Sequence, residues 1–171
     1  MRDVCMAERE ALKGSPAKDR IQTLVTERLT QDIGGVIDAQ GGWQKISIAV
    51  DSGAAETVIP HALILGHPIK PTQASLAGVC YASATGAPIP NPGEQQLPLV
   101  TNEGSLRAMT FQAAPVAKPL GSVKRMCKSG HRVVFDDDGS YIENKVTGEI
   151  NWLREEEGNY MLDVWVMPLS E

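Results

Sequence analysis

Short runs in which every second residue is apolar recur along the chain. Ile46, Ile48 and Val50 alternate with small or polar residues, a period of two that is typical of a half-buried strand. This strand would end at Asp51, and a second apolar run follows at 57–59. Further runs predict strands at 97–100, 106–111, 131–135, 140–144, 150–154 and 160–166. Gly and Pro turns separate the runs, so the pattern predicts a mainly β fold, either a barrel or a sandwich.

Helical spacing occurs in two places. The Ser-Pro pair at 15–16 favours a helix start, and apolar residues at helical spacing follow it. The second place follows Leu120-Gly121, where Val123 and Met126 have helical spacing and Gly130 is suited to end a helix. The sequence therefore predicts an N-terminal helix and one short helix within the β region.

Composition and charge limit the classes of protein to which this chain can belong. The chain has 171 residues, is 42% hydrophobic and carries a net charge of -5, which fits one domain with appendages. It lacks the clustered Lys and Arg of nucleic-acid-binding proteins and any apolar run near the roughly 18 residues of a membrane span. The chain has three cysteines, Cys5, Cys80 and Cys127. This odd number and the lack of CxxC spacing predict reduced thiols. We expect a cytoplasmic protein that binds neither nucleic acid nor membrane.

The triplet Asp51-Ser52-Gly53 follows the first strand directly. Such a triplet alone is typical of a helix cap or an Asx turn. Here Ala49-Val50 precedes it, Ala54 follows it, and the apolar strand Thr57-Val58-Ile59 comes next. With both flanks, the segment resembles the signature of aspartic proteases, specifically the retropepsins of retroviruses and retrotransposons, and copia-like polyprotein proteases most of all.

Two later segments resemble retropepsins in the same order. Residues 81–89 resemble the β-hairpin flap, with small residues and Gly86 at its tip. The Leu120-Gly121 segment with its short helix resembles the end of the protease core. The resemblance, which covers about 43–135, implies a closed β barrel with one short helix and the following division of the chain. We expect an N-terminal helical extension at 1–42, a retropepsin-like domain at 43–136, and a C-terminal β-meander extension, packed on that domain, at 137–171.

The resemblance also implies a site and a mechanism. Only one Asp-Ser-Gly triplet is present, so the catalytic pair would be Asp51 from each of two chains in a homodimer. The two carboxylates would share a proton, one acting as base on a water and the other as acid, without metal or cofactor. Ser52 and Gly53 would support the pair. The implied substrate-binding residues are Ala54, Ala84, Thr85, Gly86 and Ala87.

The implied function is an aspartic endopeptidase of a retrotransposon-like polyprotein, in the cytoplasm or a retroelement particle. It would cleave extended polypeptides with apolar residues at the scissile bond. The alternative is a catalytically silent dimerisation or peptide-binding module of the same fold. One departure is Ser122, because the family usually has Arg or Asp after the Gly. An ion pair between subunits would then be absent or supplied by Lys124 or Arg125.

Two possible metal sites have weaker support in the sequence. Cys127 and His131 give two possible zinc ligands, short of the four that a structural site needs. The acidic segment 136–139 is similar to the start of a calcium loop, yet Thr147 stands where an EF-hand needs Glu. A hairpin turn explains 136–139 better.

Overall fold

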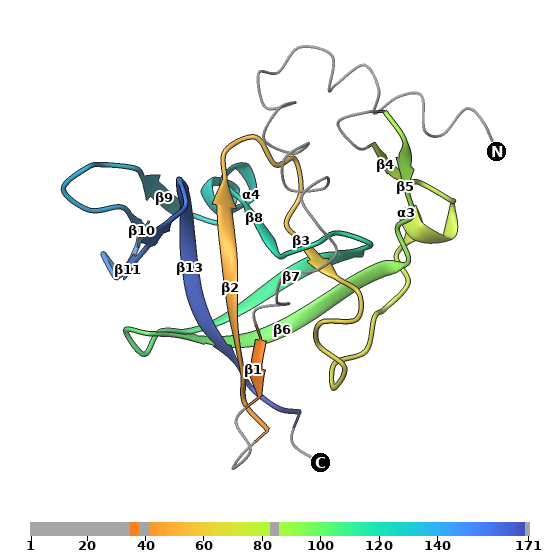
Figure 1. Ribbon diagram of the computed structural model, residues 1–171, viewed down its shortest axis with the longest axis horizontal. Coiled ribbons are helices and arrows are strands. Elements are labelled where there is room, and N and C mark those ends of the chain that lie inside the picture. Colours follow the sequence, from red (N-terminus) through yellow and green to blue (C-terminus); the bar gives the residue numbers. More distant parts are fainter. Residues whose placement is uncertain (1–34, 38–41, 83–85, 170–171) are drawn as a thin grey trace.

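Short strands make up most of the described chain, as the alternating pattern predicts (Figure 1). The computed structural model describes residues 35–37, 42–82 and 86–169. In chain order the strands are β1 (Gly35–Ile37), β2 (Gln44–Asp51), β3 (Val58–Pro60), β4 (Tyr81–Ala82), β5 (Pro88–Ile89), β6 (Gly93–Thr101), β7 (Leu106–Ala114), β8 (Leu120–Ser122), β9 (His131–Val134), β10 (Tyr141–Asn144), β11 (Ile150–Trp152), β12 (Arg154–Glu156) and β13 (Asn159–Val166). The helix predicted after residues 15–16 lies outside the described residues.

Six of these strands close into a barrel. Hydrogen bonding runs in the order β2-β8-β3-β7-β6-β13, and β13 pairs again with β2. β1 and β12 are added at the two ends of this sheet. The prediction of a mainly β fold is confirmed, and the closed circuit selects the barrel over the sandwich.

The barrel encloses one main core. Alternate residues of its strands supply the largest fully buried apolar side chains, which are Ile46, Ile48, Ile59, Leu97, Leu99, Phe111 and Val164. Burying one such side chain stabilises the fold by about 1.5–3 kcal/mol. Met126 and Ile142 join the same core from outside the barrel strands. The predicted period of two is thus the alternation between core and surface.

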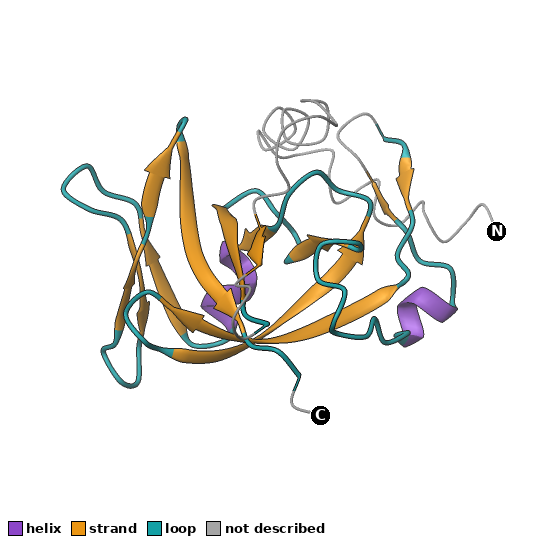
Figure 2. Cartoon of the chain, turned by 60° about the horizontal axis from the view of Figure 1, so that its bottom comes forward, coloured by secondary structure: helices purple, strands orange, loops and turns teal. Residues whose placement is uncertain are grey.

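The helices of the described residues are short. α4 (Val123–Lys128) follows β8 directly and lies beside the barrel strands, as predicted (Figure 2). α3 (Gln73–Leu76) lies in the Pro-rich segment after β3, where no helix was expected. Its start is a capping box in which the side chains and backbones of Thr72 and Ser75 bond reciprocally. Among the described residues, no helix is long and apolar enough to span a membrane.

The C-terminal region divides between two sheets. β9, β10 and β11 form an antiparallel sheet of their own, and a hairpin turn at 136–139 joins the first two, as predicted. β13 leaves this meander and pairs with β2 over seven residues and with β6 over three. The expected extension at 137–171 therefore supplies one strand of the barrel itself. Leu162 and Val164 explain this, because they need the same core as Ile46 and Ile48.

The cysteines differ from expectation. Cys80 is disulfide-bonded, so the prediction of reduced thiols is wrong there. Cys127 is a free, exposed thiol as predicted. Cys5 lies outside the described residues. The spacing of cysteines along the sequence does not reveal such a bond, because pairing depends on the distance between cysteines in the folded chain.

A buried carboxylate connects β13 to two of its neighbouring strands, β2 and β12. Asp163 on β13 accepts a hydrogen bond of 2.5 Å from the Ser47 hydroxyl on β2. Arg154 on β12 donates to both oxygens of Asp163, at 2.8 and 3.1 Å. Asp163 is only 8% exposed, and the Arg154 guanidinium holds the pKa of this carboxyl below its usual range. The ionised form of Asp163 therefore stabilises the closure of the barrel.

We expect Asp163→Asn to lower the free energy of unfolding at pH 7 by about 1–2 kcal/mol, since Arg154 is partly exposed and screened. The native pKa lies below the unfolded value of about 3.9, so the stabilisation is present above that value and is lost as the pH falls through the native pKa. Urea unfolding at pH 7 and at pH 3 measures this. The gap between variant and wild type should shrink at pH 3. Asp137→Asn, an exposed control, should show no gap at either pH, and a constant gap for Asp163→Asn would contradict the assignment.

Candidate active site

Asp51 is the last residue of β2 and lies inside the protein. β2 and β8 run parallel there, with Asp51 beside Ser122 in the register. Asp51 is 7% exposed, and its Oδ1 accepts a hydrogen bond of 2.7 Å from the Gly53 amide. This bond is the Asx turn that the triplet alone predicts. It accounts for one of the two carboxylate oxygens.

The other oxygen, Oδ2 of Asp51, has no hydrogen-bond partner in the described structure, although it is buried. Among the described side chains, only Gln95 Oε1 shares this condition. An unpaired buried polar atom costs about 1–3 kcal/mol, and more where it carries charge. Such a cost is unusual in a folded chain and marks the atom as a candidate for function. The Asx turn does not explain it.

Ser122 holds the loop between β2 and β3 in place. Its hydroxyl donates to the Ala54 carbonyl at 2.7 Å, and its amide donates to Thr57 Oγ1 at 3.1 Å. The same hydroxyl accepts from the Arg125 amide at 3.3 Å and so caps α4. Ser122 is fully buried. One side chain therefore links the loop that carries the triplet to the start of the helix.

The role of Ser122 was missed in the sequence, where it stood only as a departure from the family pattern. The sequence contains a local signal for the capping role, because Ser directly before a run with helical spacing is a strong N-cap residue. Its bond to Ala54, which is 68 positions away, has no local signature.

A second link between loop and helix is ionic. Glu56 in the loop and Arg125 on α4 form a bidentate pair, with Arg125 Nε 2.8 Å from Glu56 Oε2. The pair raises the pKa of Arg125. Both side chains are partly exposed, so the pair contributes less than about 1 kcal/mol. Arg125, expected as one source of an ion pair between subunits, is engaged within its own chain.

The predicted substrate-binding residues fall into two places. Ala54 is buried in the loop just described. Gly86 and Ala87 belong to the β4–β5 hairpin, and Gly86 has the left-handed φ of +81° that a tight turn requires. Ala84 and Thr85 lie outside the described residues. The structure thus groups Asp51 to Ala54 in one loop, with Gly86 and Ala87 on a separate hairpin.

The hairpin stands beyond the start of β6 (Figure 1). Tyr81 anchors it, because its hydroxyl donates to Gln112 Oε1 on β7 at 3.0 Å and accepts from Asn91 Nδ2 at 3.1 Å. A β hairpin in this segment is therefore confirmed, and its base is fixed to the barrel. Its function as a flap stays a prediction.

Metal binding finds no support among the described residues, where no three His, Cys, Asp or Glu side chains converge. His131 Nδ1 instead lies 3.1 Å from the Ser129 hydroxyl. No known family model, curated protein or solved structure matches this chain.

Ser122→Ala should lower the free energy of unfolding by about 2 kcal/mol, because it removes the bond to Ala54 and the cap of α4 together. Urea unfolding gives this value, and hydrogen exchange should show faster exchange in 52–57 and at the start of α4. Ser129→Ala is the matched control at the other end of the helix, with an expected loss below about 0.5 kcal/mol. Equal losses for the two variants would contradict the role given to Ser122.

Proposed function

We propose that this chain is an aspartic endopeptidase of the retropepsin type, in which Asp51 acts together with Asp51 of a second copy. The observation that carries the proposal is the state of the Asp51 carboxylate. One oxygen is fixed by the Gly53 amide, and the other is buried and unpaired. A second carboxyl group that shares a proton would give Oδ2 the hydrogen bond it lacks.

The order of elements supports the same proposal. A strand ends at the Asp-Ser-Gly triplet, a hairpin follows, and the Leu120-Gly121 segment then leads into a short helix. That segment lies parallel to β2 and brings the cap residue Ser122 beside Asp51. The triplet and the Leu120-Gly121 segment, two of the elements on which the resemblance rests, are thus neighbours in the barrel.

The proposed reaction needs no group outside the two chains, the peptide and water. The ionised carboxylate removes a proton from a water molecule, whose oxygen bonds to the peptide carbonyl carbon. The protonated carboxyl gives its proton to the carbonyl oxygen, and a gem-diol forms. Proton transfer to the peptide nitrogen then breaks the C–N bond and releases an amine and a carboxylic acid. Gly53 orients the carboxylate, and Ser52, which is exposed, is available to bond across the axis.

One observation favours the alternative of a silent module. In the single chain Oδ2 of Asp51 has almost no accessible surface. A water or a second carboxyl group reaches it only if the surrounding chain moves when two copies associate. Without that movement, the barrel would associate or bind peptide but not hydrolyse it.

Peptides with apolar residues at the centre should be cleaved by the wild-type chain, and Asp51→Asn should lower the rate by about a thousandfold or more. Liquid chromatography with mass spectrometry detects the products. Asp137→Asn is the matched control, since it makes the same change on the exposed turn at 136–139. Equal rates for wild type and Asp51→Asn would exclude the proposed chemistry. Peptide binding without any cleavage by the wild type would establish the silent module.

Shared catalysis by two chains has its own signature. The rate per chain should rise with protein concentration, in step with dimer formation followed by sedimentation. In an equimolar mixture with Asp51→Asn, random pairing should lower the activity of each wild-type chain to about half. Activity that is independent of concentration and unaffected by the variant would show that one chain suffices.

A further inference from the structure

A stretch of β7 presents an open edge. β7 pairs with β6 along its length, but its other neighbour, β3, covers only Gln112 to Ala114. The Gln112 amide bonds to the Thr57 carbonyl at 2.8 Å, and there the pairing stops. Residues 106–111 of β7 thus have no strand beside them on that side among the described residues.

The register shows which backbone groups point toward the open side. In an antiparallel pair, residues alternately face one another and face away. Glu94, opposite Gln112, bonds through both its amide and its carbonyl to Lys70, and the carbonyl of Pro98, opposite Ala108, accepts from Met167. The amide and carbonyl groups of these β6 residues therefore point away from β7. Those of their partners on β7 point away from β6. The amide and carbonyl groups of Ala108 and Thr110 accordingly point away from β6, and both residues are exposed.

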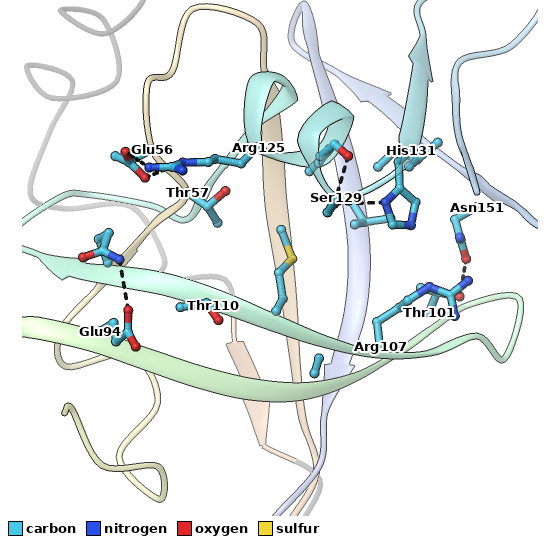
Figure 3. A pocket seen from close by; sticks show the side chains of 16 residues that line it. Glu56, Thr57, Glu94, Thr101, Arg107, Thr110, Arg125, Ser129, His131 and Asn151 are labelled. Carbon is cyan, nitrogen blue, oxygen red and sulfur yellow. Dashed lines mark hydrogen bonds and ion pairs between the residues drawn. The ribbon is translucent and has the colours of Figure 1, made fainter. Parts of the chain in front are cut away.

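This edge lines a groove of about 540 Å³ (Figure 3). Its opposite wall is α4, which contributes Arg125 and Met126, with Ser129 directly after the helix. The volume lies within the range of roughly 300–1,000 Å³ that is typical of ligand sites. Asp51 does not line the groove, so this space is separate from the carboxylate described above.

The groove is lined by both apolar and charged side chains. The apolar lining residues include Met109 and Met126, together with Ile142 and Leu162 of the core. At one end Glu94 has no cationic partner in the described structure, and its carboxylate meets only the Gln112 side-chain amide at 3.5 Å. This end therefore offers an uncompensated negative charge.

At the other end, Figure 3 places Arg107 and His131 near the bond between Thr101 and Asn151. Arg107 forms an ion pair with Glu149, and its guanidinium also donates to the Leu106 carbonyl at 2.8 Å. The cation at this end is therefore already neutralised. The unsatisfied charge of the groove is the Glu94 carboxylate.

We propose that this groove binds an extended polypeptide segment, which adds to the open edge of β7 as a further strand. The backbone of the segment bonds to the four free groups of Ala108 and Thr110. An apolar side chain of the segment packs against Met109 and Met126, and a Lys or Arg at one end meets Glu94. The site is independent of the proposed proteolysis, because none of its residues belongs to the carboxylate pair.

A labelled peptide pool tests the proposal. The probes are short fluorescein-labelled peptides with Leu at the centre and Lys at either end, titrated by fluorescence anisotropy into Asp51→Asn, so that no probe is cleaved. The tightest probe is then made in two N-methylated forms, each with methyl groups on one of the two alternating sets of amides. Strand addition uses only one set, so one form should lose about tenfold or more in affinity and the other should not.

Variants of the protein locate the binding. Thr110→Pro removes an amide that makes no bond within the sheet, so the barrel keeps its hydrogen bonds while the affinity falls about tenfold. Thr110→Val is the matched control, which keeps the amide and should bind like the parent. Glu94→Gln should weaken the Lys probes and leave a probe without Lys unchanged.

Three results would overturn the proposal. The first is a pool in which no peptide binds, and the second is equal loss of affinity for both N-methylated forms. The third is unchanged affinity in Thr110→Pro. The N-methylated probes act on the parent protein, so they decide the matter even if Thr110→Pro does not fold.

Discussion

The pairing of β2 with β13 and β8 is the constraint on which the rest of the structure depends. β13 bonds to β2 along seven residues and closes the barrel, while β8 runs parallel to its last three residues. A strand held on both sides has a fixed end, so the carboxylate of Asp51 has a fixed position. Asp163, bonded to Ser47 and Arg154, reinforces this closure from within the sheet. Barrel stability and the geometry of the candidate site are therefore coupled through one strand.

The loop that follows β2 owes its shape to few bonds. Ser122 of β8 bonds to Ala54 and Thr57 in the loop. Glu56 in the loop pairs with Arg125 of α4. The neutral bonds are buried, whereas the ion pair is partly exposed and weaker. The buried hydroxyl of Ser122 thus matters more for the loop than the charged pair does. Oδ2 of Asp51, at the start of this loop, is buried and still lacks a hydrogen-bond partner in the described structure.

The sequence predicted individual elements better than their partners. Alternation at Ile46, Ile48 and Val50 fixes which face of a strand is buried, and helical spacing located α4, because both are local properties. Neither specifies which strands pair, so β13 was expected in a meander although it closes the barrel. The same limit applies to the site. The triplet predicted the Asp51 turn, but the bond of Ser122 joins it to Ala54, 68 positions away, and no motif near Cys80 signals its disulfide.

The candidate site and the open edge of β7 have a common origin in the shortness of β3. β3 runs parallel to β7, so residues 52–57, had they continued the strand, would have covered 106–111. They instead turn away to form the loop of the triplet, and the last bond to β7 is made by Thr57. The residues that give Asp51 its turn are thus the residues whose departure uncovers Ala108 and Thr110. Lengthening β3 toward its N-terminus would close the groove and remove the loop together, so one feature of the chain underlies both sites.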